Sequence, residues 1–202
     1  MTAAHPSCYP FTNMAAKRFD KIIVIDLEST CWEEGTEPRN TPSEIIEVGV
    51  CTLGIEKLNR DDRRSVLIKP GFSTVSEFCT KLTSLTQADV DGGTTLKAAC
   101  KTLLKDYRSK DRMWASWGDY DRHMFQKNCE IAEISYPFCS THQNIRTLFT
   151  AMMGLSEAPP LPEAMKMLNA KFEGNHHRGV DDAWNAAFIL GYIMQNFRKG
   201  RG

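Results

Sequence analysis

The chain has 202 residues, of which 42% are hydrophobic, which is enough for one packed domain but short for two. Lysine and arginine number 25, as do aspartate and glutamate, so the formal net charge is zero (25 − 25 = 0). This balance argues against a broad basic face for long double-stranded nucleic acid. It does not argue against a site that holds only a few nucleotides.

The ends of the chain and its cysteines indicate a compartment. No apolar run is long enough to cross a bilayer, and the N-terminus lacks the basic and apolar regions of a signal peptide. Seven widely spaced cysteines, without any Cys-x-x-Cys motif, predict reduced thiols. We therefore expect a cytoplasmic protein with no membrane partner. Residues 18–198 should form one domain between a flexible tail at 1–17 and a basic tail at 199–202.

Three strands are expected first along the chain. Residues 19–26 are rich in isoleucine and valine and lack polar alternation, which is typical of a buried strand. Residues 44–54 and 63–69 have the composition of a second and a third strand. The dipeptide Pro70-Gly71 should end the third strand.

Helices and shorter strands follow. The sequence Thr86-Gln87-Ala88-Asp89 has the form of a capping box and predicts the start of a short helix. Apolar residues at helical spacing predict an amphipathic helix over 95–107. The remaining expected elements are a strand at 113–117, a helix at 121–130, a strand at 141–146, and helices at 162–168 and 182–197. Together these elements predict a single α/β domain.

The first expected strand ends by presenting two acidic residues, Asp26 and Glu28. Because side chains alternate along a strand, both project from the same face. Two carboxylates a few ångströms apart repel each other unless a proton or a cation lies between them. Oxygen ligands without a nearby thiolate suit Mg²⁺ or Mn²⁺ better than zinc. The pair therefore predicts a metal-dependent site for phosphate chemistry.

Two further patches carry candidate residues, and each leaves a choice open. Trp117-Gly118-Asp119-Tyr120-Asp121 offers two aspartates, either of which could be a helix N-cap. In the third patch, His176–Asp181 and His177–Asp182 have the same spacing. Helical phase favours Asp182, because it shares a helix face with apolar positions that should pack on the sheet.

Short motifs extend these patches over residues 19–195. They are Asp26-Leu27-Glu28-Ser29-Thr30-Cys31, Glu44-Ile45-Ile46-Glu47, Phe78-Cys79-Thr80-Lys81-Leu82-Thr83-Ser84-Leu85-Thr86-Gln87, Tyr136-Pro137-Phe138, Asn144-Ile145-Arg146 and His177-Arg178-Gly179-Val180-Asp181-Asp182. In this order they resemble the DEDDh family of 3′–5′ exonucleases. Within that family they resemble the Eri-type branch of histone-mRNA 3′ exonucleases and its KapD-like bacterial relatives.

The resemblance implies a ribonuclease-H-like fold, which is a five-stranded mixed sheet flanked by helices. It also implies a choice between the two aspartates of the second patch. In the family pattern a bulky apolar residue stands four positions after the catalytic aspartate, and Phe125 meets this condition for Asp121. Asp119 is then expected to cap the following helix.

The same branch pattern selects His177 and Asp182 in the third patch. His176 would then lie outside the site, as a structural histidine. Asp181 would complement the dipole of the helix that follows it.

The cofactor implied by the resemblance is a pair of divalent ions, Mg²⁺ or Mn²⁺. Their ligands would be Asp26, Glu28, Asp121 and Asp182, with Asp26 bridging the two ions. His177 would take the proton from the attacking water.

The resemblance further implies a set of substrate-binding residues. Phe78 and Leu82 would form an apolar clamp around the terminal base, and Tyr120 would stack on it, because every base has an aromatic face. Thr30 would offer its hydroxyl or its backbone N–H to the terminal ribose.

The expected function is 3′–5′ exonuclease activity that releases nucleoside 5′-monophosphates. The expected substrates are single-stranded or structured RNA 3′ ends, with single-stranded DNA as a further candidate. Two alternatives stay open. One is a DNA-directed exonuclease of repair or proofreading, which shares the chemistry. The other is a regulatory binding module that keeps the fold and acts through a partner protein.

Overall fold

The computed structural model describes residues 18–200, so the tail expected at 1–17 lies outside the described residues. Residues 201–202 of the expected basic tail lie outside them as well. Lys199, which was expected in that tail, is the last residue of the final helix.

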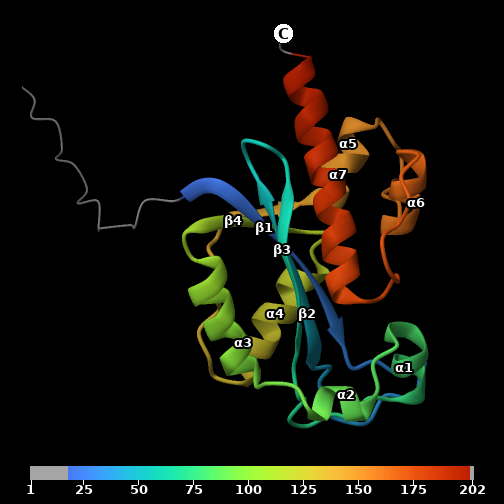
Figure 1. Ribbon diagram of the computed structural model, residues 1–202. Helices are drawn as coiled ribbons and strands as arrows, with labels where there is room; N and C mark the ends of the chain where they lie inside the picture. Colours follow the sequence, from blue (N-terminus) through green and yellow to red (C-terminus); the bar gives the residue numbers. More distant parts are fainter. Residues whose placement is uncertain (1–17, 201–202) are drawn as a thin grey trace, which may run out of the picture.

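A five-stranded mixed sheet forms the centre of the structure (Figure 1). Its strands are β1 (Arg18–Ser29), β2 (Ile45–Gly54), β3 (Arg60–Leu67), β4 (Arg112–Ser116) and β5 (His142–Asn144), in the spatial order β3-β2-β1-β4-β5. The β1–β2 and β2–β3 pairs are antiparallel, whereas β1–β4 and β4–β5 are parallel. All five strands lie where the sequence predicted them, with boundaries that differ by a few residues.

The helices are more numerous than expected. They are α1 (Glu77–Thr83), α2 (Gln87–Asp91), α3 (Leu96–Thr102), α4 (Tyr120–Ile131), α5 (Ile145–Met152), α6 (Leu161–Met167) and α7 (Gly179–Lys199). The helix expected over 95–107 is α3 followed by a π-helical turn, η1 (Leu103–Tyr107). The capping box at Thr86 and Asp89 is present at the start of α2. The helices α1 and α5 were not predicted.

Alternate side chains of β1 enter two different cores on opposite faces of the sheet. Ile22 and Val24 pack with residues of α5, α6 and α7. Ile23 and Ile25 pack with residues of α3, η1 and α4 on the other face. Because side chains alternate along a strand, the acidic residues that continue the even-numbered series lie on the α7 face.

Candidate active site

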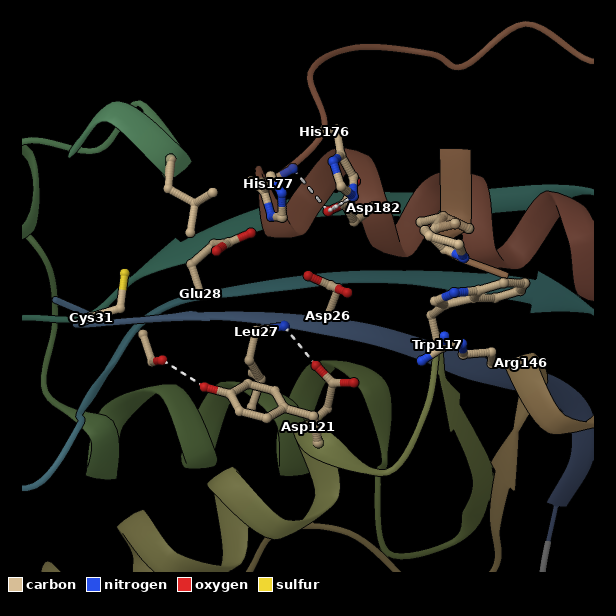
Figure 2. Close-up of a pocket in the computed structure, with 15 residues that line it drawn as sticks. Asp26, Leu27, Glu28, Cys31, Trp117, Asp121, Arg146, His176, His177 and Asp182 are labelled. Atoms are coloured by element: carbon tan, nitrogen blue, oxygen red, sulfur yellow. Dashed lines mark hydrogen bonds and ion pairs between the residues drawn. The ribbon is translucent and has the colours of Figure 1, made fainter. Parts of the chain in front are cut away.

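One pocket of about 460 Å³ lies where the ends of β1 and β4 meet the start of α7 (Figure 2). It is lined by Asp26, Leu27, Glu28, Ser29, Cys31, Leu82, Trp117, Tyr120, Asp121, Arg146, Pro160, Leu161, His176, His177 and Asp182. All four expected metal ligands and the expected general base are in this set. Three segments that are far apart in the sequence therefore meet in one cavity.

Asp26 and Glu28 reach the pocket from β1, on the α7 face of the sheet (Figure 2). Burial is the largest cause that raises the pKa of Glu28, to about 8, and the negative charge of Asp182 is the next. Burial also raises the pKa of Asp26, with the charge of Asp121 as the next cause. Both carboxylates have lost water and face other acids, so their charged forms are disfavoured without a cation.

Asp121, in the first turn of α4, is the aspartate of the second patch that enters the pocket. Its buried Oδ1 accepts a hydrogen bond from the backbone amide of Leu27 (3.0 Å). This bond joins α4 to β1 next to the acidic pair. Burial raises the pKa of Asp121 to about 6, although the hydrogen bond from Leu27 lowers it.

Asp119 does not line the pocket, and its expected role differs in detail from the structure. It occupies the N-cap position of α4, but its side chain makes no capping hydrogen bond. Its Oδ2 instead accepts a hydrogen bond from Asn144 Nδ2 (2.7 Å), and its Oδ1 pairs with Arg122 (3.0 Å). Asp119 therefore connects α4 to the end of β5.

The first turn of α7 lies directly against β1 and β2, because two glycines leave no side chain between them. A Cβ atom on Gly49 would lie 1.8 Å from the backbone carbonyl carbon of Gly179. A Cβ atom on Gly179 would lie 2.9 Å from the backbone oxygen of Asp26. The buried Glu47 completes this contact, since its Oε2 accepts the Gly179 amide (3.1 Å). The close approach brings Asp182 to the acidic residues of β1.

The two adjacent histidines both line the pocket, so the expectation that His176 lies outside the site is wrong. Their ring centroids are 3.8 Å apart. The backbone amide of His177 donates to Asp182 Oδ2 (3.0 Å), and His176 Nε2 lies 4.0 Å from the same oxygen. His177 has a left-handed φ of 64°, which turns the chain so that both rings reach the cavity. Burial lowers the pKa of both histidines.

Asp181 does not line the pocket. Its Oδ2 accepts the backbone amide of Asn175 (2.7 Å), and its Oδ1 pairs with Arg63 of β3. It lies in the first turn of α7, where the expected dipole complement would be, and it also fastens the preceding loop. Asp181 and Asp182 stand at the same spacing from His176 and His177, and only Asp182 lines the cavity.

The residues present fit a divalent metal. One carboxylate oxygen from each of Asp26, Glu28 and Asp182 lies within 4.8 Å of the others. Asp182 Oδ1 is buried and has no hydrogen-bond partner among the described residues. Buried polar atoms normally have a partner, and this one is left with a free lone pair among other acids. Burial raises the pKa of Asp182 to about 7. Oxygen donors of this kind are the ligands that Mg²⁺ and Mn²⁺ prefer.

Two of the four expected substrate-binding residues, Leu82 and Tyr120, line the pocket. Leu82 lies in α1 and Tyr120 in α4, and Tyr120 is 55% exposed. The Tyr120 hydroxyl lies 2.8 Å from Ser29 Oγ. Phe78, one helical turn before Leu82, is 42% exposed but is not among the lining residues.

The contact expected for Thr30 does not agree with the structure, because this residue is completely buried (0% exposed). Its backbone amide donates to the Glu44 carbonyl oxygen (2.8 Å). Its hydroxyl accepts the Glu44 amide (2.9 Å) and bonds to Ser73 Oγ (3.0 Å). Both groups that were expected to reach a ribose are therefore used inside the protein.

Trp117, Arg146 and Cys31 line the pocket, although the sequence did not give them a role. All three stand within or next to patches and motifs that the sequence singled out. Proximity to a motif was the signal available. Trp117 directly follows β4, Arg146 lies in the first turn of α5, and Cys31 follows β1, so which of these side chains turn into the cavity depends on how these elements pack.

Comparisons with known proteins indicate one protein family. The family model of the RNase_T exonucleases matches residues 23–190. Among curated proteins, the chain is 29% identical to 3′-5′ exoribonuclease 1 of Homo sapiens, over 92% of this chain and 55% of that protein. It is 23% identical to the probable 3′-5′ exonuclease KapD of Bacillus subtilis, over 88% of this chain and 86% of that protein.

A similar solved structure is the nuclease domain of 3′hExo, a DEDDh family member, bound to rAMP. It has a TM-score of 0.78 and 28% sequence identity, over 90% of this chain and 95% of that one. A second is the complex of a 3′-exonuclease with the histone mRNA stem-loop, with a TM-score of 0.78 and 28% identity.

The chain spans 55% and 29% of the lengths of the first two curated human relatives that it matches. No helix in residues 18–200 is long and apolar enough to cross a membrane. The ribonuclease-H-like fold expected from the sequence is confirmed, as is the resemblance on which it depended. The chain belongs to the RNase_T exonuclease family, in its DEDDh group.

Proposed function

We propose that this chain is a 3′–5′ exonuclease that removes nucleoside 5′-monophosphates from the 3′ ends of RNA. The observation that carries the proposal is the convergence of four carboxylates from β1, α4 and α7 in one pocket. Each has a raised pKa, and one buried oxygen of Asp182 has no partner among the described residues. Such an arrangement is costly for folding unless cations occupy it.

Asp26, Glu28, Asp121 and Asp182 would hold two Mg²⁺ or Mn²⁺ ions. When bound, these ions would supply electrostatic stabilisation of the charge that develops on the scissile phosphate. Membership of the DEDDh group supports this metal dependence.

His177 would accept the proton of the attacking water at a ring nitrogen. Burial lowers its pKa, so the imidazole is neutral near pH 7 and keeps a free lone pair. Its backbone amide is fixed by Asp182 Oδ2 (3.0 Å), which places the residue beside the acidic cluster. His176, whose ring is tilted by 44° against that of His177, would restrict the orientation of the His177 ring.

The terminal nucleoside would lie between Leu82 and Tyr120, with Phe78 closing the outer side. Leu82 and Tyr120 line the pocket and all three side chains are exposed, which supports this placement, because stacking on a base is sequence-tolerant. A pocket closed over the last base would accept only a free 3′ end, which supports exonucleolytic cleavage.

RNA is proposed as the main substrate and single-stranded DNA as a second one. The support comes from relatives, since similar structures contain rAMP and the histone mRNA stem-loop. The six cysteines within the described residues are all free, which supports a reducing compartment such as the cytoplasm. We further propose that residues 18–198 suffice for activity.

The test is degradation of end-labelled single-stranded RNA and DNA of the same sequence, with Mg²⁺, with Mn²⁺ and with EDTA. We expect stepwise shortening from the 3′ end of RNA, release of 5′-monophosphates and no activity in EDTA. Faster degradation of DNA would favour the repair-type alternative. Binding of RNA without degradation in either metal would favour the regulatory module. Nicking of a circular strand would contradict the exonuclease proposal.

A further inference from the structure

The pocket has two ends, and the carboxylates lie between them (Figure 2). At one end Cys31 lies beside α1, because Ser76 Oγ, at the N-cap of α1, donates to the Cys31 carbonyl oxygen (2.6 Å). At the opposite end, beyond Asp26, lie Trp117 and Arg146. The proposed function uses the first end and the centre, and leaves the second end without a role.

Arg146 is the only lysine or arginine among the described residues that line this pocket. Its Nε and Nη2 donate to the backbone carbonyl oxygens of Pro159 (2.9 Å) and Ala158, which fixes the plane of the guanidinium group. No carboxylate within residues 18–200 pairs with it, and its Nη1 has no hydrogen-bond partner there. Arg178, at the N-cap of α7, is by contrast paired with Glu47 (3.3 Å). The guanidinium group of Arg146 is therefore fixed in position, and no carboxylate among the described residues neutralises its charge.

The chemistry of this end suits a phosphodiester. A fixed guanidinium group presents N–H donors in a geometry that matches phosphate oxygens. The Trp117 side chain lines the pocket beside Arg146. Its ring is held in place by Phe149, with ring centroids 6.0 Å apart. A side chain with two nitrogens already bonded loses little freedom when it binds an anion, so its interaction is pre-organised.

The position of this end relative to the carboxylates gives the identity of the ligand. In the proposed function, on which this inference rests, the terminal base lies between Leu82 and Tyr120 and the scissile phosphate lies over the carboxylates. The next nucleotide must then continue past Asp26, toward Trp117. We propose that the Trp117–Arg146 end binds the penultimate nucleotide, with Arg146 paired to the phosphate on its 5′ side.

The experiment removes one charge from the substrate and one from the protein. Two five-nucleotide single strands are compared, identical except that the phosphate on the 5′ side of the penultimate nucleotide is an uncharged methylphosphonate in one of them. For the wild-type protein, this replacement should lower kcat/KM roughly 10-fold or more, as expected for a charge-assisted hydrogen bond. Arg146→Gln should be slow on both substrates and should no longer distinguish them.

Two further variants separate this role from simple misfolding. Arg146→Lys keeps a positive charge and should retain part of the discrimination, with a melting temperature that shows whether the loop at 158–159 has loosened. Arg64→Gln is the matched control, because Arg64 is an exposed cation of β3 paired with Asp106 (2.9 Å) and does not line the pocket. It should discriminate between the two substrates as the wild-type protein does.

The outcomes are distinct. The subsite proposal is overturned if wild-type protein cleaves both strands equally, or if Arg146→Gln still prefers the fully charged strand by the wild-type factor. It is also overturned if Arg64→Gln loses the preference to the same extent. If wild-type protein cleaves neither these strands nor longer ones with metal present, the exonuclease proposal itself fails and the subsite falls with it.

Discussion

Two acidic pairs of the sheet region have opposite surroundings. Glu44, just before β2, accepts the backbone amides of residues 71–73 and the hydroxyl of Ser73. Glu47 accepts Ser65 Oγ, Arg178 Nε and the Gly179 amide. No hydrogen bond within the described residues reaches the side chains of the other pair, Asp26 and Glu28 on β1.

This difference in hydrogen-bond donors distinguishes an acidic residue that stabilises the fold from a candidate metal ligand. Glu47 and Glu28 are both buried, and each belongs to a motif that marks the family. What separates them is the number of protein donors around each carboxylate. An acid with donors stabilises the fold, whereas a buried acid without them costs stability until a cation arrives.

The largest effect expected from this comparison is that of Asp26→Asn. Exonuclease activity should fall to the background of the assay, because Asp26 is one of the proposed metal ligands and would lose its negative charge. Stability in EDTA should stay the same or increase, because repulsion among the carboxylates is relieved. Glu47→Gln should instead lower the free energy of unfolding. Gel assays and urea denaturation of both variants check this, and Asp26→Asn activity within a few-fold of wild type would contradict the assignment.

His177→Ala should lower turnover roughly 10²–10⁴-fold, the usual worth of a positioned acid–base group, while binding of Mn²⁺ persists. His176→Ala is the matched control at the adjacent position and should cost much less, since His176 lines the pocket but is not the proposed base. The rate of wild-type protein should rise with pH through the lowered pKa of His177 and then level off. A His176 variant that is the more damaged of the two would transfer the role of the base to His176.

Glu44→Gln should destabilise the protein by about 1.5–3 kcal/mol, because charge-assisted hydrogen bonds to the loop at 71–73 are weakened. Denaturation midpoints in urea measure the loss. Metal affinity, followed by the change in melting temperature with Mn²⁺, should stay close to wild type, since Glu44 is not a proposed ligand. A variant with unchanged stability would show that the loop does not depend on this carboxylate.

The smallest effect concerns pH in the absence of metal. The pKa of Glu28 is about 8 in the folded chain, above the ordinary value of about 4.3 for an unfolded glutamate. The folded state therefore binds more protons between these values, and stability should decrease as pH rises from about 4 to 8. Melting temperatures in EDTA should follow this trend, and Mg²⁺ should reverse it at pH 8. Glu28→Gln should flatten the dependence, and an unchanged slope would contradict the raised pKa.

The strands β1 and β2 could be predicted from sequence because they bury long apolar runs. The last helix, α7, could be predicted because its apolar residues recur at helical spacing. The short helix α1 spans only about two turns, and α5 was missed because the strand expected over 141–146 included its first residues, although its apolar residues follow helical spacing. Each of the two helices begins at a side-chain cap, Ser76 in α1 and Asn144 in α5. Caps of this kind are common in loops as well, so they did not distinguish a helix from a turn.

The acidic residues of the pocket could be predicted because strand and helix periodicity fix where they point. His176 could not, because its approach depends on the left-handed backbone of His177. For Thr30 the strand alternation gave the wrong prediction. Its position two residues after Glu28 suggested that it reaches the pocket, but it is buried. The bulge in the β1–β2 pairing between Glu28 and Ser29 breaks the alternation just before it.

The contact between Gly49 and Gly179 has a consequence for how this activity could be lost or tuned. The distance between Asp26 and Asp182 depends on the contact between the backbones of Gly49 and Gly179, two residues that carry no functional group. A single methyl group at position 49 would push α7 away from the sheet while every acidic residue stayed in the sequence. A related sequence could thus keep all four acidic residues and His177 and still encode an inactive protein. Conversely, any sequence change that moves this helix by a fraction of an ångström acts on the chemistry without touching it.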